Sequence, residues 1–300
     1  MAATLYTHQS TNVTKTWFLM AIFLAMVVAI GYFFSYTYNN LGILYFAVIF
    51  SVIMNITSYW YSDKISLALT GARPASREEF FDFYTVTENL AIAAGLPMPK
   101  LYVINDPAPN AFATGRNKEH AAVAATTGLL QTLNRTELEG VIAHELSHIG
   151  NRDTLLMTVV VVLVGFLAIL SDIFLRSRMF SGGSRDDNKG GNVLMLVGII
   201  LAILSPIIAT LIQLAISRKR EFLADASGVL LTRYPEGLAS ALQKISSFTR
   251  PMQKASTATA HLFISNPLGA GKNSKGPGFF AKLFMTHPPV QERISALLSK

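Results

Sequence analysis

The chain contains no cysteine, so disulfides, thiolate metal ligands and cysteine nucleophiles are excluded, and any bound metal must be held by His, Asp or Glu. Charged residues are also scarce, at 14% of the 300 residues, whereas 51% of the residues are hydrophobic. An ordinary soluble domain is about 25% charged. The composition therefore favours a membrane protein.

Nucleic acid is not an expected partner, although the formal net charge is +7. The basic residues are scattered or lie at the ends of apolar runs, and they lack the interleaved aromatic residues of a surface that stacks bases. Attraction to the anionic face of a lipid bilayer explains the positive charge more simply.

Four long apolar runs follow one another along the chain in two pairs. Residues 17–36 and 41–60 carry no charged side chain, and each run is long enough to cross a hydrocarbon core of about 30 Å. They predict a transmembrane hairpin at residues 17–60, preceded by a short cytoplasmic segment at residues 1–16. A secretory signal peptide is the alternative for the first run, but no cleavage site of the A-x-A type precedes the second.

The second pair of apolar runs comprises residues 154–171 and 192–216 and predicts another transmembrane hairpin, at residues 154–216. Two helices buried in a soluble core are the alternative, but their length and lack of amphipathic alternation favour lipid. In the first pair, Trp17 and Trp60 are expected at the same membrane interface, where amphipathic rings are favoured. The sequence therefore predicts a four-helix transmembrane anchor.

The positions of Lys and Arg near the helix ends indicate the orientation of this anchor. The side that bears Glu145 carries Lys15, Lys64, Arg152, Arg218, Lys219 and Arg220, and the opposite side carries Arg176, Arg178, Arg185 and Lys189. The positive-inside rule therefore predicts that the hydrophilic parts face the cytoplasm. The basic loop between the third and fourth runs opposes this orientation.

The hydrophilic segments, residues 61–153 and 217–300, have the local signals of a soluble α+β domain. The capping-box pattern at residues 76–79 predicts the start of a helix, and short β-rich stretches predict strands at residues 101–104 and 121–128. Neither segment has enough elements to bury a core alone. The two segments are therefore expected to share one core.

Further helices are predicted in both hydrophilic segments. A second capping-box pattern, at residues 136–139, predicts the start of the helix that carries His144. Later helices are expected at residues 217–231, from Pro235 onward, and at residues 290–300. The Gly, Pro and Lys rich stretch at residues 266–278 is expected to be a mobile loop.

His144, Glu145 and His148 form the pattern HExxH. Positions i and i+4 of a helix lie on one face, so the two histidines can offer neutral imidazole nitrogens to a single Zn²⁺ ion. Glu145 is then near enough to take a proton from a zinc-activated water that attacks a peptide carbonyl. A chance occurrence of the pattern is the alternative.

A catalytic zinc site normally has three protein ligands, and HELSHIGNRDT offers no further histidine. Glu221 and Asp225 also lie at i and i+4, so Glu221 can be the third ligand while Asp225 accepts the free N–H of a ligand imidazole. A solvated helix face is the alternative for this pair. The two candidate metal segments are separated by two apolar runs, and an even number of crossings returns the chain to the same side of the membrane.

Four motifs in this order resemble the HtpX family of membrane-bound zinc endopeptidases: NAFATG at 110–115, HELSHIGNRD at 144–153, SRKREFLADASG at 217–228 and THPPVQERI at 286–294. This family belongs to the gluzincin group, which also includes the prenyl-protein CAAX proteases. The resemblance spans essentially the whole chain and all four apolar runs.

The resemblance implies one Zn²⁺ ion per chain, held by His144, His148 and Glu221, with Glu145 as the catalytic residue. It implies unfolded or damaged membrane proteins as substrates. It also implies a location in the bacterial cytoplasmic (inner) membrane, with the active site facing the cytoplasm.

The resemblance further implies substrate-binding and catalytic roles for residues outside the metal motifs. NAFATG is expected to be an edge strand that binds an extended substrate through Asn110, Ala111 and Phe112. A plain turn residue is the alternative for Asn110. His287 and Arg293 are expected to reach the site and stabilise the oxyanion at the scissile carbonyl, and a structural histidine before two prolines is the alternative.

Together these features predict a mainly helical α+β, zincin-type metalloprotease domain on a four-helix transmembrane anchor. The expected reaction is hydrolysis of peptide bonds within proteins by a zinc-activated water, with Glu145 as general base. A CAAX-type prenyl-protein protease is one alternative, but the larger membrane chamber of that family cannot be built from four runs. A non-catalytic membrane scaffold or quality-control adaptor is another. The remaining histidines, His8, His120 and His261, match no motif and are expected at the surface.

Overall fold

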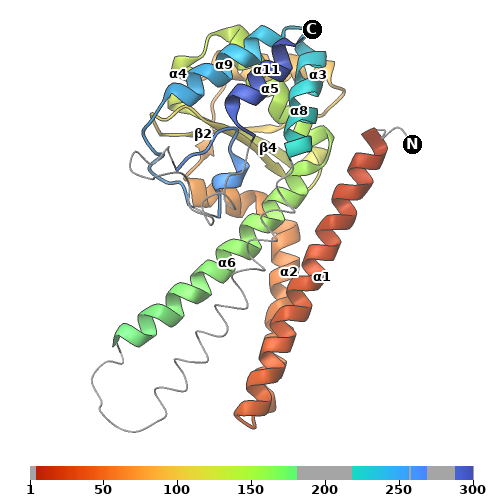
Figure 1. Ribbon diagram of the computed structural model, residues 1–300, viewed down its shortest axis with the longest axis vertical. Coiled ribbons are helices and arrows are strands. Elements are labelled where there is room, and N and C mark those ends of the chain that lie inside the picture. The colour runs from red at the N-terminus through yellow and green to blue at the C-terminus, as the bar shows by residue number, and fades with distance from the viewer. Residues whose placement is uncertain (1–4, 181–217, 257, 269–287, 300) are drawn as a thin grey trace.

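The computed structural model describes residues 5–180, 218–256, 258–268 and 288–299, with side chains described for residues 9–166 of the first range (Figure 1). The predicted fourth apolar run and His287 lie outside these residues. The described part of the chain is mainly helical and contains a small sheet. This confirms the predicted α+β class, while the four-helix anchor stays a prediction.

Two long apolar helices, α1 (Leu5–Thr37) and α2 (Leu41–Thr70), form a hairpin that contains the first two predicted apolar runs. Both helices are long and apolar enough to cross a membrane. The Asn40 side chain accepts a hydrogen bond from the Gly42 N–H and so caps α2. Figure 1 shows the two helices side by side, extending away from the globular part of the molecule.

The aromatic residues at one end of this hairpin lie at one level. Trp17 of α1 stacks on Tyr59 of α2 with 5.5 Å between the ring centroids, and Tyr59 meets Trp60 edge-on at 5.5 Å. Trp17 and Trp60 are both about half exposed, at 54% and 51%. The two tryptophans therefore lie at the same level of the hairpin, as the prediction requires, and a membrane interface at this level stays a prediction.

The third predicted apolar run lies in α6 (Asp153–Phe180), which follows α5 (Arg135–Gly150) after a sharp bend. The two helix axes meet at 83°, and the pair is long and apolar enough to cross a membrane only if both helices are taken as one broken span. The bend arises because Asn151 ends α5 and Arg152 adopts a left-handed conformation with φ 58°. Within the described residues, the chain thus has two helices that could cross a membrane, or three if the bent pair counts.

A four-stranded sheet has the order β1–β2–β4–β3 and consists of β1 (Arg73–Pro74), β2 (Lys100–Ile104), β3 (Ala111–Gly115) and β4 (Ala121–Thr126). β2 and β4 are parallel, and the other two pairings are antiparallel. The strands predicted at 101–104 and 121–128 are confirmed, except that the chain turns into α4 (Thr127–Thr132) at Thr127. β3 lies at the edge of the sheet, as predicted for NAFATG.

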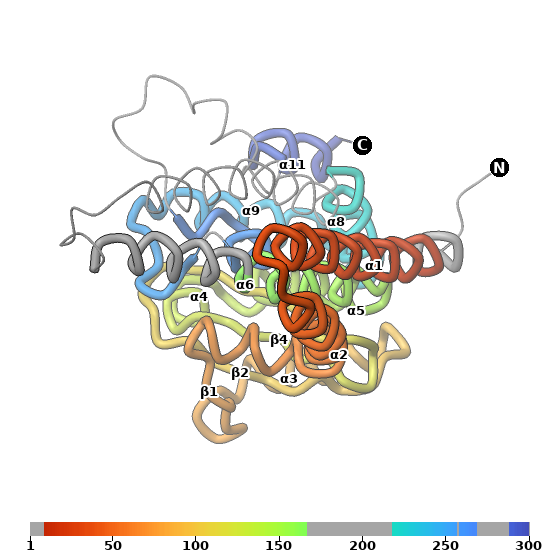
Figure 2. The backbone as a smooth tube through the Cα atoms, turned by 90° about the horizontal axis from the view of Figure 1, so that it is seen from below, coloured from red at the N-terminus to blue at the C-terminus, as the bar shows by residue number. Residues whose placement is uncertain are grey.

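Helix α5 occupies the centre of the globular part and packs against α3 (Phe81–Ala93), α8 (Arg218–Thr232) and α9 (Pro235–Ser247). The last helix, α11 (Val290–Leu298), contacts α8 and α9. Figure 2 shows the sheet on one side of α5 and the helices α8, α9 and α11 on the other. The helix starts predicted at Pro235 and in the last residues are confirmed.

The core around α5 draws on both hydrophilic segments, because its buried residues come from positions 75–149 and 238–264. A second apolar cluster joins Phe112 of β3, Val161 of α6 and Phe263. Since Ala111 and Ala113 belong to the first cluster and Phe112 to the second, the side chains of β3 alternate between the two.

Three local predictions were wrong. The first capping-box pattern does not start a helix at Arg77: the Ser76 hydroxyl accepts the Glu79 N–H at 3.2 Å within a turn, and α3 begins at Phe81. The capping box of α5 is formed by Asn134 and Glu137 instead of Thr136 and Glu139. His261 is buried, at 1% exposure, and its Nε2 lies 3.1 Å from the Met157 carbonyl oxygen. His120 is exposed as expected, and the His8 side chain lies outside the described residues.

Candidate metal centre

Helix α5 holds His144, Glu145 and His148 in the interior of the globular part. The three side chains are 1%, 2% and 5% exposed, respectively. The reciprocal hydrogen bonds of the capping box, at 2.9 and 2.8 Å between Asn134 and Glu137, fix where the helix begins. Because α5 is covered by α3, α8 and α9, both imidazoles are held in a site that excludes most solvent.

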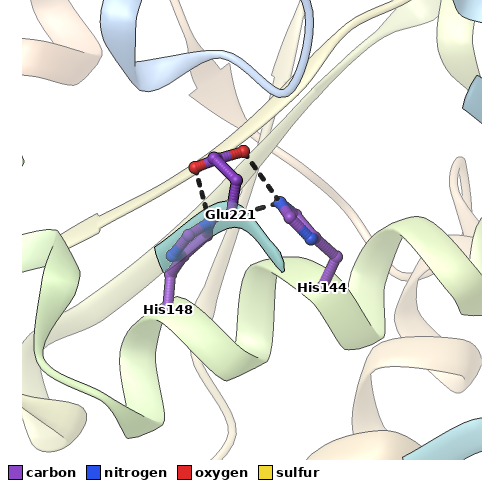
Figure 3. A group of neighbouring side chains, drawn as sticks. All are labelled: His144, His148 and Glu221. Atoms are coloured by element: carbon purple, nitrogen blue, oxygen red, sulfur yellow. Dashed lines mark hydrogen bonds and ion pairs between the residues drawn. The ribbon is translucent and has the colours of Figure 1, made fainter. Parts of the chain in front are cut away.

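Glu221 of α8 approaches both histidines of α5 (Figure 3). The Nε2 atoms of His144 and His148 are 3.2 Å apart. The Glu221 carboxylate oxygens lie 3.9 Å from the first nitrogen and 3.6 Å from the second. One ligand atom from each of the three residues lies within 4.8 Å of the others, so the fold brings together side chains that are far apart in sequence.

These three side chains fit a metal ion. Two imidazole nitrogens and one carboxylate are the ligand set of several catalytic zinc sites. Ligand atoms about 2.0–2.1 Å from a tetrahedral zinc would be about 3.3 Å apart. The observed separations of 3.2, 3.6 and 3.9 Å are close to that spacing. The two Nε2 atoms and the Glu221 carboxylate therefore face one position that suits a metal ion of the size of zinc.

The other ring nitrogen of His144 is held by Asp225. His144 Nδ1 lies 2.8 Å from Asp225 Oδ1, as expected if the carboxylate accepts the N–H. Arg293 of α11 donates two hydrogen bonds to the same carboxylate, at 2.8 and 2.6 Å. Burial raises the pKa of Asp225, but the hydrogen bonds from Arg293 and His144 outweigh it and hold that pKa below its ordinary value.

The other ring nitrogen of His148 is held by Asp153, a residue that the sequence analysis did not select. His148 Nδ1 lies 3.0 Å from Asp153 Oδ2, and the Asp153 side chain is 1% exposed. Asn12 of α1 donates to the other oxygen of Asp153 at 2.7 Å. Asp153 is the last residue of the HELSHIGNRD motif and lies five residues after His148, and this spacing puts the two side chains together only because the chain bends after α5.

Glu145 lies next to the three candidate ligands, and its pKa is raised. Burial raises the pKa of Glu145 to about 7, and the charge of Glu221 adds to the rise. His148, the Ala113 N–H and Arg293 oppose it. A carboxyl group with a pKa near neutrality can both accept and return a proton at the pH of a cell.

The two histidines have opposite pKa shifts. Burial lowers the pKa of His144 to about 4, despite the hydrogen bond to Asp225. Burial also disfavours the charged form of His148, but the hydrogen bond to Asp153 and the charge of Glu221 outweigh it and raise the pKa of His148 to about 9. Metal ligation requires neutral imidazoles, so binding of a metal would displace the proton of His148.

The residues predicted to bind substrate lie on and beside β3. The Asn110 amide donates to the Ser265 carbonyl at 2.9 Å, and its oxygen accepts the Ser265 N–H at 3.2 Å. The Ala111 carbonyl accepts the Ile264 N–H at 2.9 Å. Phe112 is fully buried, and its ring packs edge-on against Phe263 at 5.0 Å. These three residues thus contact the segment Phe263–Ser265 in the described structure.

Arg293, predicted to be catalytic, lies at the site but is 1% exposed. Besides Asp225 it contacts the Ile264 carbonyl at 3.2 Å and Glu221 at 3.7 Å. Its guanidinium therefore joins three segments around the candidate ligands. His287, the other predicted catalytic residue, lies outside the described residues.

Comparison with known proteins supplies a family. The sequence profile of Peptidase family M48 matches residues 78–300. A "Protease HtpX homolog" of Caldanaerobacter subterraneus subsp. tengcongensis is 51% identical over 99% of this chain and 98% of that protein. Proteins with the same description are 50% identical in Thermoanaerobacter pseudethanolicus (99% and 98% covered) and 44% identical in Streptococcus gordonii (98% and 99%). These matches confirm the resemblance indicated by the four motifs.

A solved structure shows a related fold. The crystal structure of S. mikatae Ste24p matches with a TM-score of 0.51 at 20% sequence identity, over 98% of this chain and 67% of that one. At 20% identity this match shows a similar fold and nothing about function.

Proposed function

Because the chain belongs to peptidase family M48 and is a membrane metalloprotease, we propose that it is a zinc-dependent endopeptidase that cleaves misfolded or damaged membrane proteins. One observation carries the proposal: His144, His148 and Glu221 converge within 4.8 Å, directly beside Glu145. That arrangement matches a metal-dependent hydrolase, whereas a scaffold would not need it.

His144, His148 and Glu221 would hold the zinc ion, which would act as a Lewis acid that polarises the scissile carbonyl and lowers the pKa of water toward about 7. Glu145 takes a proton from the attacking water and returns it to the leaving amine. Its raised pKa, about 7, suits both steps. Asp225 and Asp153 hold the two imidazoles in the orientation that directs both Nε2 atoms toward the Glu221 carboxylate.

We further propose that Arg293 acts mainly through Asp225 and Glu221, since both of its hydrogen bonds to Asp225 are short and the side chain is buried. A role for His287 or Arg293 in stabilising the oxyanion stays a prediction. The substrate would bind as an extended strand beside β3 in the part that follows Ala111, since the Ala111 carbonyl already accepts the Ile264 N–H. The Ala113 N–H in that part contacts Glu145.

The proposed location is the cytoplasmic (inner) membrane of a bacterium, with the metal centre facing the cytoplasm. The distribution of Lys and Arg around the apolar runs supports this orientation. The metal helix α5 ends at the bend into the apolar helix α6, which supports a candidate site near the membrane surface. Membrane proteins that emerge from the bilayer would therefore meet it first.

The test is an assay of metal content and cleavage with full-length protein in detergent. We expect about one zinc per chain, cleavage that a chelator abolishes and zinc restores, and loss of both zinc and cleavage in His148→Ala. Glu145→Gln should keep the zinc but lose about 10²-fold to 10⁴-fold in cleavage rate. His120→Ala, at an exposed histidine, is the matched control and should behave like the parent protein.

The choice of substrate separates the alternatives. An unfolded membrane protein should be cleaved, and a short prenylated peptide should not be preferred over it. Absence of zinc together with absence of cleavage would contradict the proposal and favour a scaffold. Undiminished cleavage by Glu145→Gln would contradict the assignment of the general base.

A further inference from the structure

The first apolar helix reaches the end of the metal helix. Near the N-terminal end of α1, the Gln9 amide donates to the Gly150 carbonyl at 2.6 Å. One turn further on, the Asn12 amide donates to the Asn151 carbonyl at 3.1 Å. Both carbonyls belong to the last turn and cap of α5, whose carbonyl groups have no partner within their own helix. α1 thus supplies side-chain hydrogen bonds to the end of α5.

Asn12 is also linked to the candidate metal ligand His148 through one residue, Asp153. Asn12 Nδ2 donates to Asp153 Oδ1 at 2.7 Å, and Asp153 Oδ2 lies 3.0 Å from His148 Nδ1. Asn12 and Asp153 are 3% and 1% exposed, so water competes little for these bonds. A buried carboxylate with fixed partners on both oxygens can hold an imidazole ring in one orientation.

Asp153 also contacts the helix that supplies the third candidate ligand. Arg220 Nε of α8 lies 3.4 Å from Asp153 Oδ1, and Arg220 is followed directly by Glu221. Asp153 therefore interacts with side chains from α1, α5 and α8. Asn12 and Asp153 are 141 residues apart in sequence.

We infer that Asn12 is a positioning residue for the metal centre, acting through Asp153 on His148, so that the first apolar helix is a part of the metal site as well as an anchor. This inference rests on the proposed function, namely that His148 is a zinc ligand. It implies that a change in the position of α1 in the bilayer changes zinc affinity.

Simple packing of α1 is the competing explanation. It does not account for a buried asparagine, because burial of an amide side chain costs free energy unless the amide is hydrogen-bonded. Packing would be served by an apolar side chain, whereas the Asn12 amide donates to two acceptors, Asn151 and Asp153, of the segment that follows the metal helix. Replacement of Asn12 should then affect zinc binding beyond any effect on stability.

The experiment measures zinc affinity of the full-length protein in detergent by competition with a chromogenic chelator. Asn12→Leu removes both hydrogen bonds while keeping the same branched heavy-atom skeleton, and it should weaken zinc affinity about ten-fold. Asn55→Leu, the same change at a buried asparagine of α2, is the matched control and should leave affinity unchanged. Asn12→Asp, which puts a second carboxylate beside Asp153, is a second variant if Asn12→Leu folds poorly, and it too should weaken zinc affinity.

Two further readouts separate positioning from a general loss of stability. The visible spectrum of the cobalt-substituted protein should shift in Asn12→Leu and not in Asn55→Leu, because it reports the geometry of the ligands. In an Asp153→Asn background Asn12→Leu should have little further effect on zinc affinity, whereas in an Asp225→Asn background it should keep its full effect.

The outcomes are distinguishable. A parent protein that binds no zinc would overturn the proposed function, and the inference with it. A parent protein that binds zinc, together with an unchanged affinity and cobalt spectrum in both Asn12 variants, would overturn the inference alone. Equal weakening by Asn12→Leu and Asn55→Leu would also overturn it, because the effect would then come from helix packing.

Discussion

Asn110 shows how a single side chain can serve either the fold or the substrate. Its amide group binds both the N–H and the carbonyl of Ser265, at 3.2 and 2.9 Å, in the way that one extended strand binds another. The side chain is 3% exposed. The segment Phe263–Ser265 therefore occupies the partners that an extended substrate was predicted to use.

We predict that Asn110→Ala lowers stability by about 1–2 kcal/mol, since it leaves two half-buried backbone groups of Ser265 without their side-chain partner. The thermal unfolding midpoint measures this, and the KM for a peptide substrate is recorded with it. Asn117→Ala, which removes the cap of a short exposed turn, is the control and should shift the midpoint less. An unchanged midpoint together with a raised KM would show instead that Asn110 binds substrate.

At the scale of single residues, helix periodicity explains what the sequence could predict about the metal centre. His144 and His148 share a face because they are four residues apart in a helix, and the same spacing links Glu221 to Asp225. Asp153 could not be found in this way, because its place beside His148 depends on the 83° bend between α5 and α6. Asn12 depends on long-range packing and leaves no local signal.

At the scale of elements, Glu137 of α5 forms side-chain hydrogen bonds that connect α5 to α9. Its carboxylate caps the start of α5 and accepts hydrogen bonds from Ser240 at 2.6 Å and Lys244 at 2.8 Å, both on α9. Burial raises the pKa of Glu137, but the bonds from Lys244, Ser240 and the Asn134 N–H outweigh it and lower that pKa below 4.5. Glu137 therefore binds protons less readily in the folded state than in the unfolded state.

The sign of the pH dependence follows from this shift. A lowered folded-state pKa contributes stability that is fully present above 4.5 and is lost as the pH falls through the folded-state value. We predict that Glu137→Gln is less stable than the parent by about 1–2 kcal/mol at pH 7, and that the difference narrows below about pH 4.5. Thermal unfolding across that pH range measures it.

Glu139→Gln is the control for this prediction, because Glu139 lies on the same helix but forms only a half-exposed pair with Arg135 at 3.5 Å. Its effect should be a few tenths of a kcal/mol at any pH. A constant difference between Glu137→Gln and the parent from pH 7 to pH 3 would contradict the assigned role of the Glu137 carboxylate.

The elements also show where local signals were insufficient. Both predicted capping boxes contain the right residue types, yet α3 starts later than predicted and α5 is capped by Asn134. A capping residue must precede the first helical turn, and several polar residues near a helix start satisfy the same pattern. The choice among them depends on tertiary contacts, such as those of Glu137 with α9.

At the scale of the whole molecule, apolar composition and the order of segments predicted most of the arrangement. Two long apolar helices form a hairpin, and residues on both sides of the second apolar pair build one core around α5. The prediction did not include the 83° bend that turns the metal helix into α6. Such a bend joins two regular helices through a left-handed residue, Arg152, and arginine has no special preference for that conformation.

The absence of cysteine makes the orientation of the molecule directly testable. We predict that Gln131→Cys, exposed in the globular part, is on the cytoplasmic side, and that Tyr38→Cys, exposed in the turn between α1 and α2, is on the outer side. The helical hairpin requires that the two positions lie on opposite sides if α1 and α2 both cross the membrane. In intact cells, a membrane-impermeant maleimide should therefore label Tyr38→Cys and leave Gln131→Cys unlabelled until the membrane is opened.

The parent protein, which has no thiol, is the background control. Labelling of Gln131→Cys alone would reverse the proposed orientation, and labelling of both positions in intact cells would show that the hairpin does not cross the membrane.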